Sequence, residues 1–152
     1  MKSKPTTAQI VIMASGAVCL LFSFFNFYKV DFGGQTEGTS AWGSGLFPLA
    51  TYVAIIGLVM AGVVALTVFA GVSLPAEILG FTWKQIHLAL AFFAALLMLG
   101  FLIVDKGSLD LGIGYFFMLL GAAGLLAGAI MLQREPEPAA GPGPGTTPPT
   151  PF

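Results

Sequence analysis

Histidine exchanges protons most readily near neutral pH, and this sequence contains a single one, His87. It lies about one helical turn inside an apolar segment, at helical spacing from Lys84, Ala91 and Ala95. An ionisable side chain within a membrane segment is a candidate for a proton relay or for contact with a solute. The alternative, which the sequence favours, is a histidine that packs between helices or reaches the membrane surface.

The other groups that can do chemistry are few and scattered. The only cysteine, Cys19, lies in an apolar run, where a thiol usually packs as a small hydrophobic side chain. One histidine and one cysteine are too few for a zinc site. The carboxylate pairs Asp31 with Glu37 and Asp105 with Asp110 flank apolar segments, where water solvates them. We therefore predict no catalytic residue, no metal, no cofactor and no enzymatic activity.

A polar, glycine-rich run, FGGQTEGTSAWGSGLFP at residues 32–48, raises the question of a phosphate-binding loop. Gly33 and Gly38 have the spacing of the two glycines in such a loop, but Thr39 stands where a lysine is required. The run is therefore interpreted as a flexible loop between two apolar segments, with Trp42 at the membrane surface. The alternative is weak contact with a cation or a partner, because Asp31 and Glu37 give the loop an acidic character.

The composition explains why chemical groups are sparse. Of 152 residues, 57% are hydrophobic and only 9% are charged, whereas a soluble domain carries about 25% charged residues. Such a chain cannot cover a water-facing surface, so a lipid bilayer is the natural solvent for most of it. The net charge of −1 gives no indication of nucleic acid binding, which calls for clustered lysine and arginine.

Four apolar segments reach the length of about 20 residues that a helix needs to cross the hydrocarbon core. They cover approximately residues 9–28, 46–70, 83–104 and 112–132. Because lipid offers no hydrogen bonds and the segments lack the alternation of barrel strands, each is predicted to be a helix. The predicted fold is all-α, an antiparallel bundle of four transmembrane helices over 9–132. It is preceded by a short terminus, 1–8, and followed by a disordered Pro/Gly-rich tail, 133–152.

Lysine and arginine are more frequent on the cytoplasmic side of membrane proteins, and this bias predicts the orientation. With the N-terminus inside, the inner side holds Lys2, Lys4, Lys84 and Arg134, and the outer side holds Lys29 and Lys106. The bias favours a multi-pass plasma membrane protein with both termini in the cytoplasm. Four aromatic residues fall near the predicted interfaces and are expected to anchor the helices there: Tyr28, Trp42, Trp83 and Tyr115.

The start of the third predicted helix has a clear local pattern. Thr82 and Gln85 have the spacing of a capping box, in which each side chain bonds the backbone N–H of the other residue. The preceding linker, 71–82, is short enough to make the second and third helices antiparallel neighbours. Within it, residues 74–81 are expected to lie flat as a small interfacial helix.

Small residues recur at four-residue spacing in two of the predicted helices. They are Gly57, Ala61 and Ala65 in the second helix, and Gly124 and Gly128 in the fourth. Helices in lipid associate through close packing, which small residues permit. Packing within the molecule is the favoured interpretation, and association with itself or with another membrane protein is the alternative.

The layout of the chain resembles a known class of proteins. Its elements are, in order, a short basic N-terminus, a helix leading into FSFFNFY, a polar run to TSAWGSG, three further helices and a Pro/Gly-rich tail. This order resembles small, functionally uncharacterised four-helix membrane proteins of actinobacteria and the architecture of the mycobacterial 34-kDa antigenic protein family. GSGLFP, at Gly43–Pro48, is similar to the segment that precedes the second helix in small membrane subunits of tripartite tricarboxylate transporters. The second resemblance implies an accessory role, and neither carries over catalytic residues.

The sequence has small residues spaced for helix packing but no side chains spaced for catalysis. It therefore predicts a non-enzymatic integral membrane protein. Its expected role is that of an accessory or structural component of a cell-envelope membrane complex, in contact with another membrane protein or with itself. On this interpretation, replacing Gly124 and Gly128 with leucine disrupts association. The alternative is a small membrane subunit of a solute transporter or channel, in which His87 and the loop carboxylates contact the solute.

Overall fold

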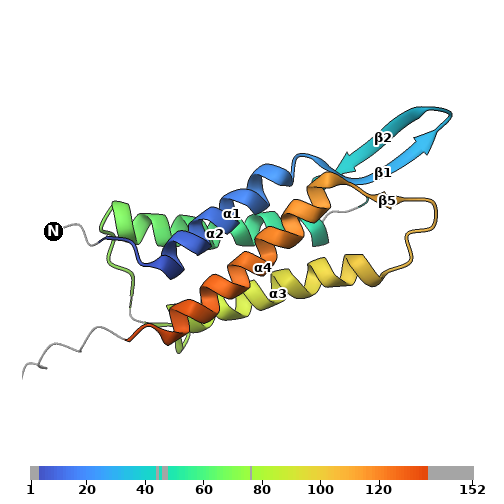
Figure 1. Ribbon diagram of the computed structural model, residues 1–152. Helices are drawn as coiled ribbons and strands as arrows, with labels where there is room; N and C mark the ends of the chain where they lie inside the picture. Colours follow the sequence, from blue (N-terminus) through green and yellow to red (C-terminus); the bar gives the residue numbers. More distant parts are fainter. Residues whose placement is uncertain (1–3, 44, 46–47, 76, 137–152) are drawn as a thin grey trace, which may run out of the picture.

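Four helices lie side by side and alternate in direction, with a small sheet at one end of the bundle (Figure 1). This computed structural model describes residues 4–43, 45, 48–75 and 77–136. The helices are α1 (Thr7–Phe22), α2 (Leu49–Phe69), α3 (Trp83–Ile103) and α4 (Ile113–Arg134). We call the end with the sheet the hairpin end. The opposite end, where α1 begins and α4 ends, is the termini end.

Three of the helices have the length and composition of membrane spans. α2 and α3 have 21 residues each and α4 has 22, all strongly apolar, so each is about 32 Å long, enough for a hydrocarbon core of about 30 Å. α1 is also apolar but has only 16 residues, about 24 Å. The prediction of four apolar helices is confirmed. However, the first helix ends at Phe22 and not at residue 28 as expected.

Capping boxes begin two of the helices. At α3 the predicted box is confirmed: the Gln85 backbone N–H donates to Thr82 Oγ1, and the Thr82 N–H donates to Gln85 Oε1 at 3.0 Å. A second box, between Thr6 and Gln9, begins α1. Both boxes satisfy backbone donors that have no partner within the helix.

Residues 26–40 form a β-hairpin, which corrects both the expected end of the first helix and the all-α fold. Strand β1 (Asn26–Phe32) pairs antiparallel with β2 (Gln35–Ser40), and β5 (Asp110–Leu111) adds to the other edge of β1, in the order β2-β1-β5. The two residues between the strands, Gly33 and Gly34, have φ values of +56° and +92°. Glycine adopts such angles readily, and a two-residue turn of this kind matches the twist of a hairpin.

The linker before α3 also differs from its expected form. A second, very short hairpin of β3 (Glu77–Ile78) and β4 (Phe81–Thr82) replaces the interfacial helix predicted for residues 74–81. Leu79 and Gly80 form its turn with φ values of +53° and +81°, which are incompatible with a helix.

At the same end of the bundle, Gln133 and Arg134 still belong to α4, which corrects the expected start of the tail. The tail from residue 137, expected to be disordered, lies outside the described residues.

The short helix α1 packs between α2 and α4, and α4 also packs against α3. At the contact of α1 with α2, a Cβ atom added to Gly57 would lie 2.9 Å from Cys19 Cβ, and one added to Gly16 would collide with the Gly57 carbonyl oxygen. Ala61 lies at the same contact, beside Gly16. The backbones of the two helices therefore approach more closely than larger side chains would allow.

The glycines of α4 make the corresponding contact on the other side of α1. A Cβ added to Gly128 would lie 2.8 Å from Ile12 Cγ1, and one added to Gly124 would collide with Ser15 Oγ. Leucine at these two positions would therefore push α4 away from α1. Such a double substitution would therefore disturb the bundle itself, and its effect on association stays a prediction.

Two glycines of α2 provide a direct test of this close packing. Gly57 faces α1, whereas a Cβ added to Gly62 would meet no atom within 4 Å. We expect Gly57→Leu to lower the free energy of unfolding by about 2–3 kcal/mol through overpacking, and Gly62→Leu to leave it nearly unchanged. Unfolding by SDS in mixed micelles, followed by far-ultraviolet circular dichroism, measures both. Equal stability of the two variants would contradict the described contact of α1 with α2.

Candidate functional site at the hairpin end

Hydrogen bonds fix the base of the hairpin to the helices. Trp42 Nε1 donates to Ser23 Oγ at 2.8 Å, and the Ala41 N–H donates to the Ser23 carbonyl at 3.1 Å. From the other side, Thr51 in the first turn of α2 donates from Oγ1 to the Ala41 carbonyl at 2.7 Å. Ser23, Ala41 and Thr51 are all fully buried. The end of α1, the end of β2 and the start of α2 are thus joined at one point.

An aromatic cluster closes the bundle beneath the sheet. Phe27 is fully buried, and its ring meets those of Tyr28, Phe101 and Tyr115 edge-on at centroid distances of 5.2, 5.0 and 5.3 Å. Aromatic pairs favour this edge-to-face arrangement. Tyr115 Oη donates to the Met98 carbonyl at 2.7 Å, which satisfies its hydroxyl inside the bundle.

These contacts separate the four expected interfacial anchors into two groups. Tyr28 and Tyr115 are buried and face the protein interior, which differs from the expectation that they would anchor at the headgroups. Trp42 remains 41% exposed, and Trp83 is partly exposed with its Nε1 donating to the Pro75 carbonyl at 2.9 Å. The two tryptophans keep the amphipathic placement that an anchor needs, and this role stays a prediction.

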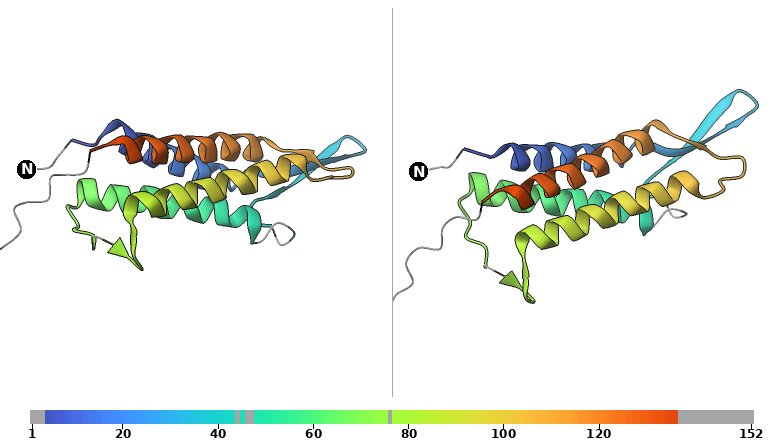
Figure 2. Two further views of the ribbon diagram at one scale, coloured as in Figure 1. Left: turned by 90° about the horizontal axis from the view of Figure 1, so that it is seen from below. Right: turned by 60° about the horizontal axis from the view of Figure 1, so that its bottom comes forward.

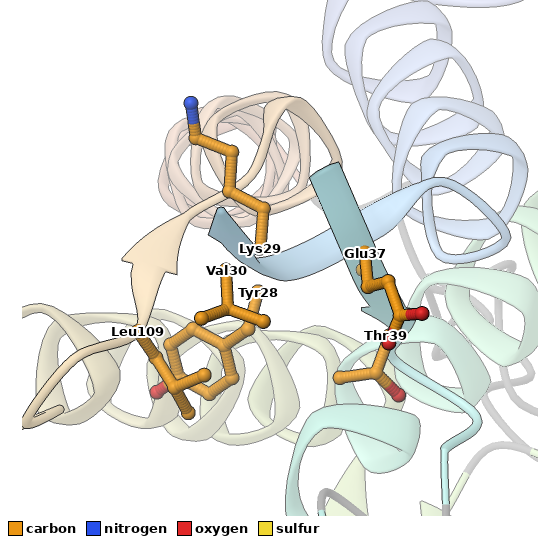
Figure 3. A pocket seen from close by; sticks show the side chains of 7 residues that line it. Tyr28, Lys29, Val30, Glu37, Thr39 and Leu109 are labelled. Atoms are coloured by element: carbon orange, nitrogen blue, oxygen red, sulfur yellow. The ribbon is translucent and has the colours of Figure 1, made fainter. Parts of the chain in front are cut away.

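The two faces of the sheet differ in character. Cross-strand pairing of Tyr28 with Thr39 and of Val30 with Glu37 places these four side chains on one face, because paired residues point the same way. Figure 3 shows them around a hollow together with Leu109, while the Lys29 side chain points away from it. The hollow, which we call the sheet hollow, has a volume of about 230 Å³.

The chemistry of the sheet hollow is that of a binding site. Its walls are the apolar Val30 and Leu109 and the ring of Tyr28, and Glu37 supplies a carboxylate. Burial raises the pKa of Tyr28, so its phenol stays protonated well above neutral pH. No base and nucleophile face each other there. The arrangement can hold a ligand that combines an apolar part with a cation or a hydrogen-bond donor.

His87 lies at the opposite end of α3, far along the bundle from the sheet. It is 4% exposed and shares the inward face of α3 with Ala91, Ala94 and Met98. Its Nδ1 lies 2.8 Å from the Trp83 carbonyl, so this nitrogen must be the donor, which leaves Nε2 as an acceptor in the neutral ring. Among the described residues Nε2 has no hydrogen-bond partner.

Cys19 is fully buried at the contacts of α1, with its Sγ 3.7 Å from the Met118 carbonyl. It packs as a small hydrophobic side chain, as predicted. In the part of the chain that the structure describes, no three side chains of the His, Cys, Asp and Glu types lie together as metal ligands would.

The sheet hollow was not predicted from the sequence. Its residues come from the segment read as a helix end and a loop, and from Leu109, about 70 residues further along the chain. One pattern could have revealed the hairpin: Gly33-Gly34 separates a stretch rich in aromatic and β-branched side chains, NFYKVDF, from a second short stretch, QTEGTS, that contains two threonines. No local sequence pattern indicates that Leu109 lines the hollow, because Leu109 directly precedes β5, a strand of only two residues.

Three apolar helices of membrane length, packed with a fourth through small residues, are the features of a helical membrane protein. Comparison of the chain with family models, with curated proteins and with solved structures finds no match.

The bond from Thr51 to the Ala41 carbonyl tests how the hairpin is held. We expect Thr51→Val to increase amide hydrogen exchange in β1 and β2, because losing a buried hydrogen bond costs about 1–2 kcal/mol. Thr67→Val is the matched control, since Thr67 Oγ1 donates only to the Val64 carbonyl of its own helix. Hydrogen exchange measured by mass spectrometry compares them, and equal exchange in the two variants would show that this bond does not hold the hairpin.

Proposed function

We propose that this protein is a non-enzymatic accessory or structural component of a cell-envelope membrane complex and receives a partner protein at its hairpin end. One observation carries the proposal. The hairpin extends beyond the helix ends in every view (Figures 1 and 2), and Phe32 beside its turn is 67% exposed. A large exposed aromatic side chain on a rigid element is typical of a binding anchor.

The free edge of the sheet supports the same location. β2 lies at the edge of the sheet, so one side of its backbone has no strand partner there. An extended segment of another protein can add to such an edge through backbone hydrogen bonds. The helix surfaces are less suited to specific contact, because Gly57, Gly124 and Gly128 are already used within the bundle.

The distribution of positive charge supports the orientation. Lys4, Lys84 and Arg134 belong to the termini end, against Lys29 and Lys106 at the hairpin end. By the positive-inside bias, the termini lie in the cytoplasm of a plasma membrane protein and the hairpin lies outside. The proposed partner is therefore reached on the outer side of the membrane.

Site-specific crosslinking in cells tests the proposed contact. A benzoylphenylalanine at Gln35, which pairs with Phe32 across the hairpin, is expected to form a protein adduct of defined mass. Phe32→Ser should lower the yield of that adduct at least fivefold. The same crosslinker at Leu79, which is 93% exposed at the turn of the other hairpin, is the control. An adduct that forms at Leu79 but not at Gln35 would move the contact to the termini end.

His87 favours a second function, that of a small subunit of a transporter or channel. A buried acceptor without a partner is uncommon, and it can receive a proton or a solute donor. Against this function, the core that surrounds α1 is filled by apolar side chains such as Ile12, Met60 and Leu125.

A flux assay in proteoliposomes separates the two functions. We expect wild type and His87→Ala to give the same proton flux as empty liposomes, because apolar side chains fill the described core. The Thr67→Val variant serves as a reconstitution control. A flux in wild type that His87→Ala abolishes and Thr67→Val retains would establish transport in place of the accessory role.

A further inference from the structure

An apolar groove opens between α2 and α3 at the hairpin end. It has a volume of about 230 Å³, and the residues that line it are Leu49, Leu96, Leu97, Gly100, Phe101 and Val104. A Cβ added to Gly100 would meet no atom within 4 Å, so no side chain of the described residues fills this space. Since α2 and α3 both have the length of membrane spans, we call this feature the α2–α3 groove and place it within the bilayer.

The sheet hollow lies next to the α2–α3 groove. Tyr28 lines the hollow and Phe101 lines the groove, and their ring centroids are 6.4 Å apart. Figure 3 shows the hollow above the ends of two helices, with Tyr28 and Leu109 over one and Thr39 over the other. The bond between Thr51 and the Ala41 carbonyl holds β2 over the start of α2. The two concave surfaces therefore lie side by side, with the rings of Tyr28 and Phe101 between them.

Polarity increases from the α2–α3 groove to the sheet hollow. The groove is apolar, the boundary is the Tyr28 ring, and the far end carries Thr39 and the Glu37 carboxylate. The lysines of this end do not neutralise that charge. Lys29 points away from the hollow, and Lys106 Nζ donates to the Leu102 and Val104 carbonyls at 3.0 and 2.9 Å, where it caps α3.

We propose that the α2–α3 groove and the sheet hollow together bind one membrane lipid whose headgroup carries an ammonium group. The acyl chain lies along Gly100 and Phe101, and the ammonium group lies beside Glu37 and Thr39. The carboxylate supplies the charge complement, and the groove supplies apolar contact for the chain. This site lies nearer the base of the hairpin than Phe32, where the partner contact is proposed.

The shape of the groove favours a lipid chain over a partner helix. The α3 residues of its lining fall within 96–104, and only Leu49 comes from α2. A transmembrane helix has a diameter of about 10 Å and packs along many turns, whereas this lining covers little more than two turns at one end. An acyl chain is narrow enough to enter such a short groove.

Native mass spectrometry of the purified full chain tests the site with two lipids of identical acyl chains, phosphatidylethanolamine and phosphatidylglycerol. Wild type should retain phosphatidylethanolamine at least fivefold better than phosphatidylglycerol. Glu37→Gln should reduce this ratio to about one. Gly100→Leu, which fills the groove, should lower the retention of phosphatidylethanolamine at least fivefold. Gly62→Leu, at an equally open position that lies beside Met13 and Leu20 of α1, should behave as wild type.

Two additions complete the test. Free ethanolamine at the same concentration should not displace the lipid, because it lacks the chain; displacement would mean that a soluble amine is the ligand and would overturn the proposal. If Gly100→Leu does not fold, Leu96→Trp replaces it, because Leu96 is an exposed wall of the groove. Equal retention of the two lipids by wild type would show that the protein carries only ordinary surrounding lipid. Equal losses of lipid in Gly62→Leu and in the groove variant would show the same. Either result would also overturn the proposal.

Discussion

The close approach of α1 to two neighbouring helices is the constraint on which the rest of the structure depends. In lipid there is little hydrophobic gain when helices meet, so they associate through close contact of small residues. Cys19 lies where both contacts converge: Cβ atoms added to Gly57 and Gly121 would lie 2.9 Å from its Cβ and 2.6 Å from its Sγ. A larger residue at Gly57 or Gly121 would push one neighbouring helix away from α1, and a larger residue at Cys19 would push away both.

The shortness of α1 determines where the sheet begins. Because α1 ends at Phe22, the chain turns before it reaches the length of the other helices, and Phe27 enters the space left at the end of the bundle. There it contacts rings from α3 and α4, Phe101 and Tyr115. The hairpin is therefore a continuation of the core. Along β1, the side chains become progressively more exposed beyond Tyr28, which is itself buried.

Hydropathy predicted most of the helical part of this fold. The expected bounds 83–104 and 112–132 differ by at most two residues from α3 and α4, because long apolar runs with turn residues between them leave few alternatives. Hydropathy failed at residues 23–28, since SFFNFY is as apolar as a helix end and equally suited to a strand. Only the following Gly33-Gly34 pair distinguished the two.

The candidate site was less predictable because it depends on which way side chains point. Tyr28 and Tyr115 lie near the ends of apolar runs, and position along the chain does not show whether such a ring faces lipid or protein. The small residues were identified, but Gly16 and Gly121, which complete their contacts, belong to no long repeat. The neighbourhood of Tyr28 and Leu109 arises from pairing of β1 with a two-residue strand, for which a single sequence gives no indication.

The two ends of the molecule use their charges differently, and this asymmetry favours recognition at the hairpin end. At the termini end, Lys84 Nζ donates to the Glu135 carbonyl at 2.6 Å and ties the start of α3 to the end of α4. At the hairpin end, Lys106 is occupied with the carbonyls that end α3. Glu37 projects from an edge strand into an open hollow. A carboxylate in that position contributes little to the bundle, so its interaction energy is available to a ligand.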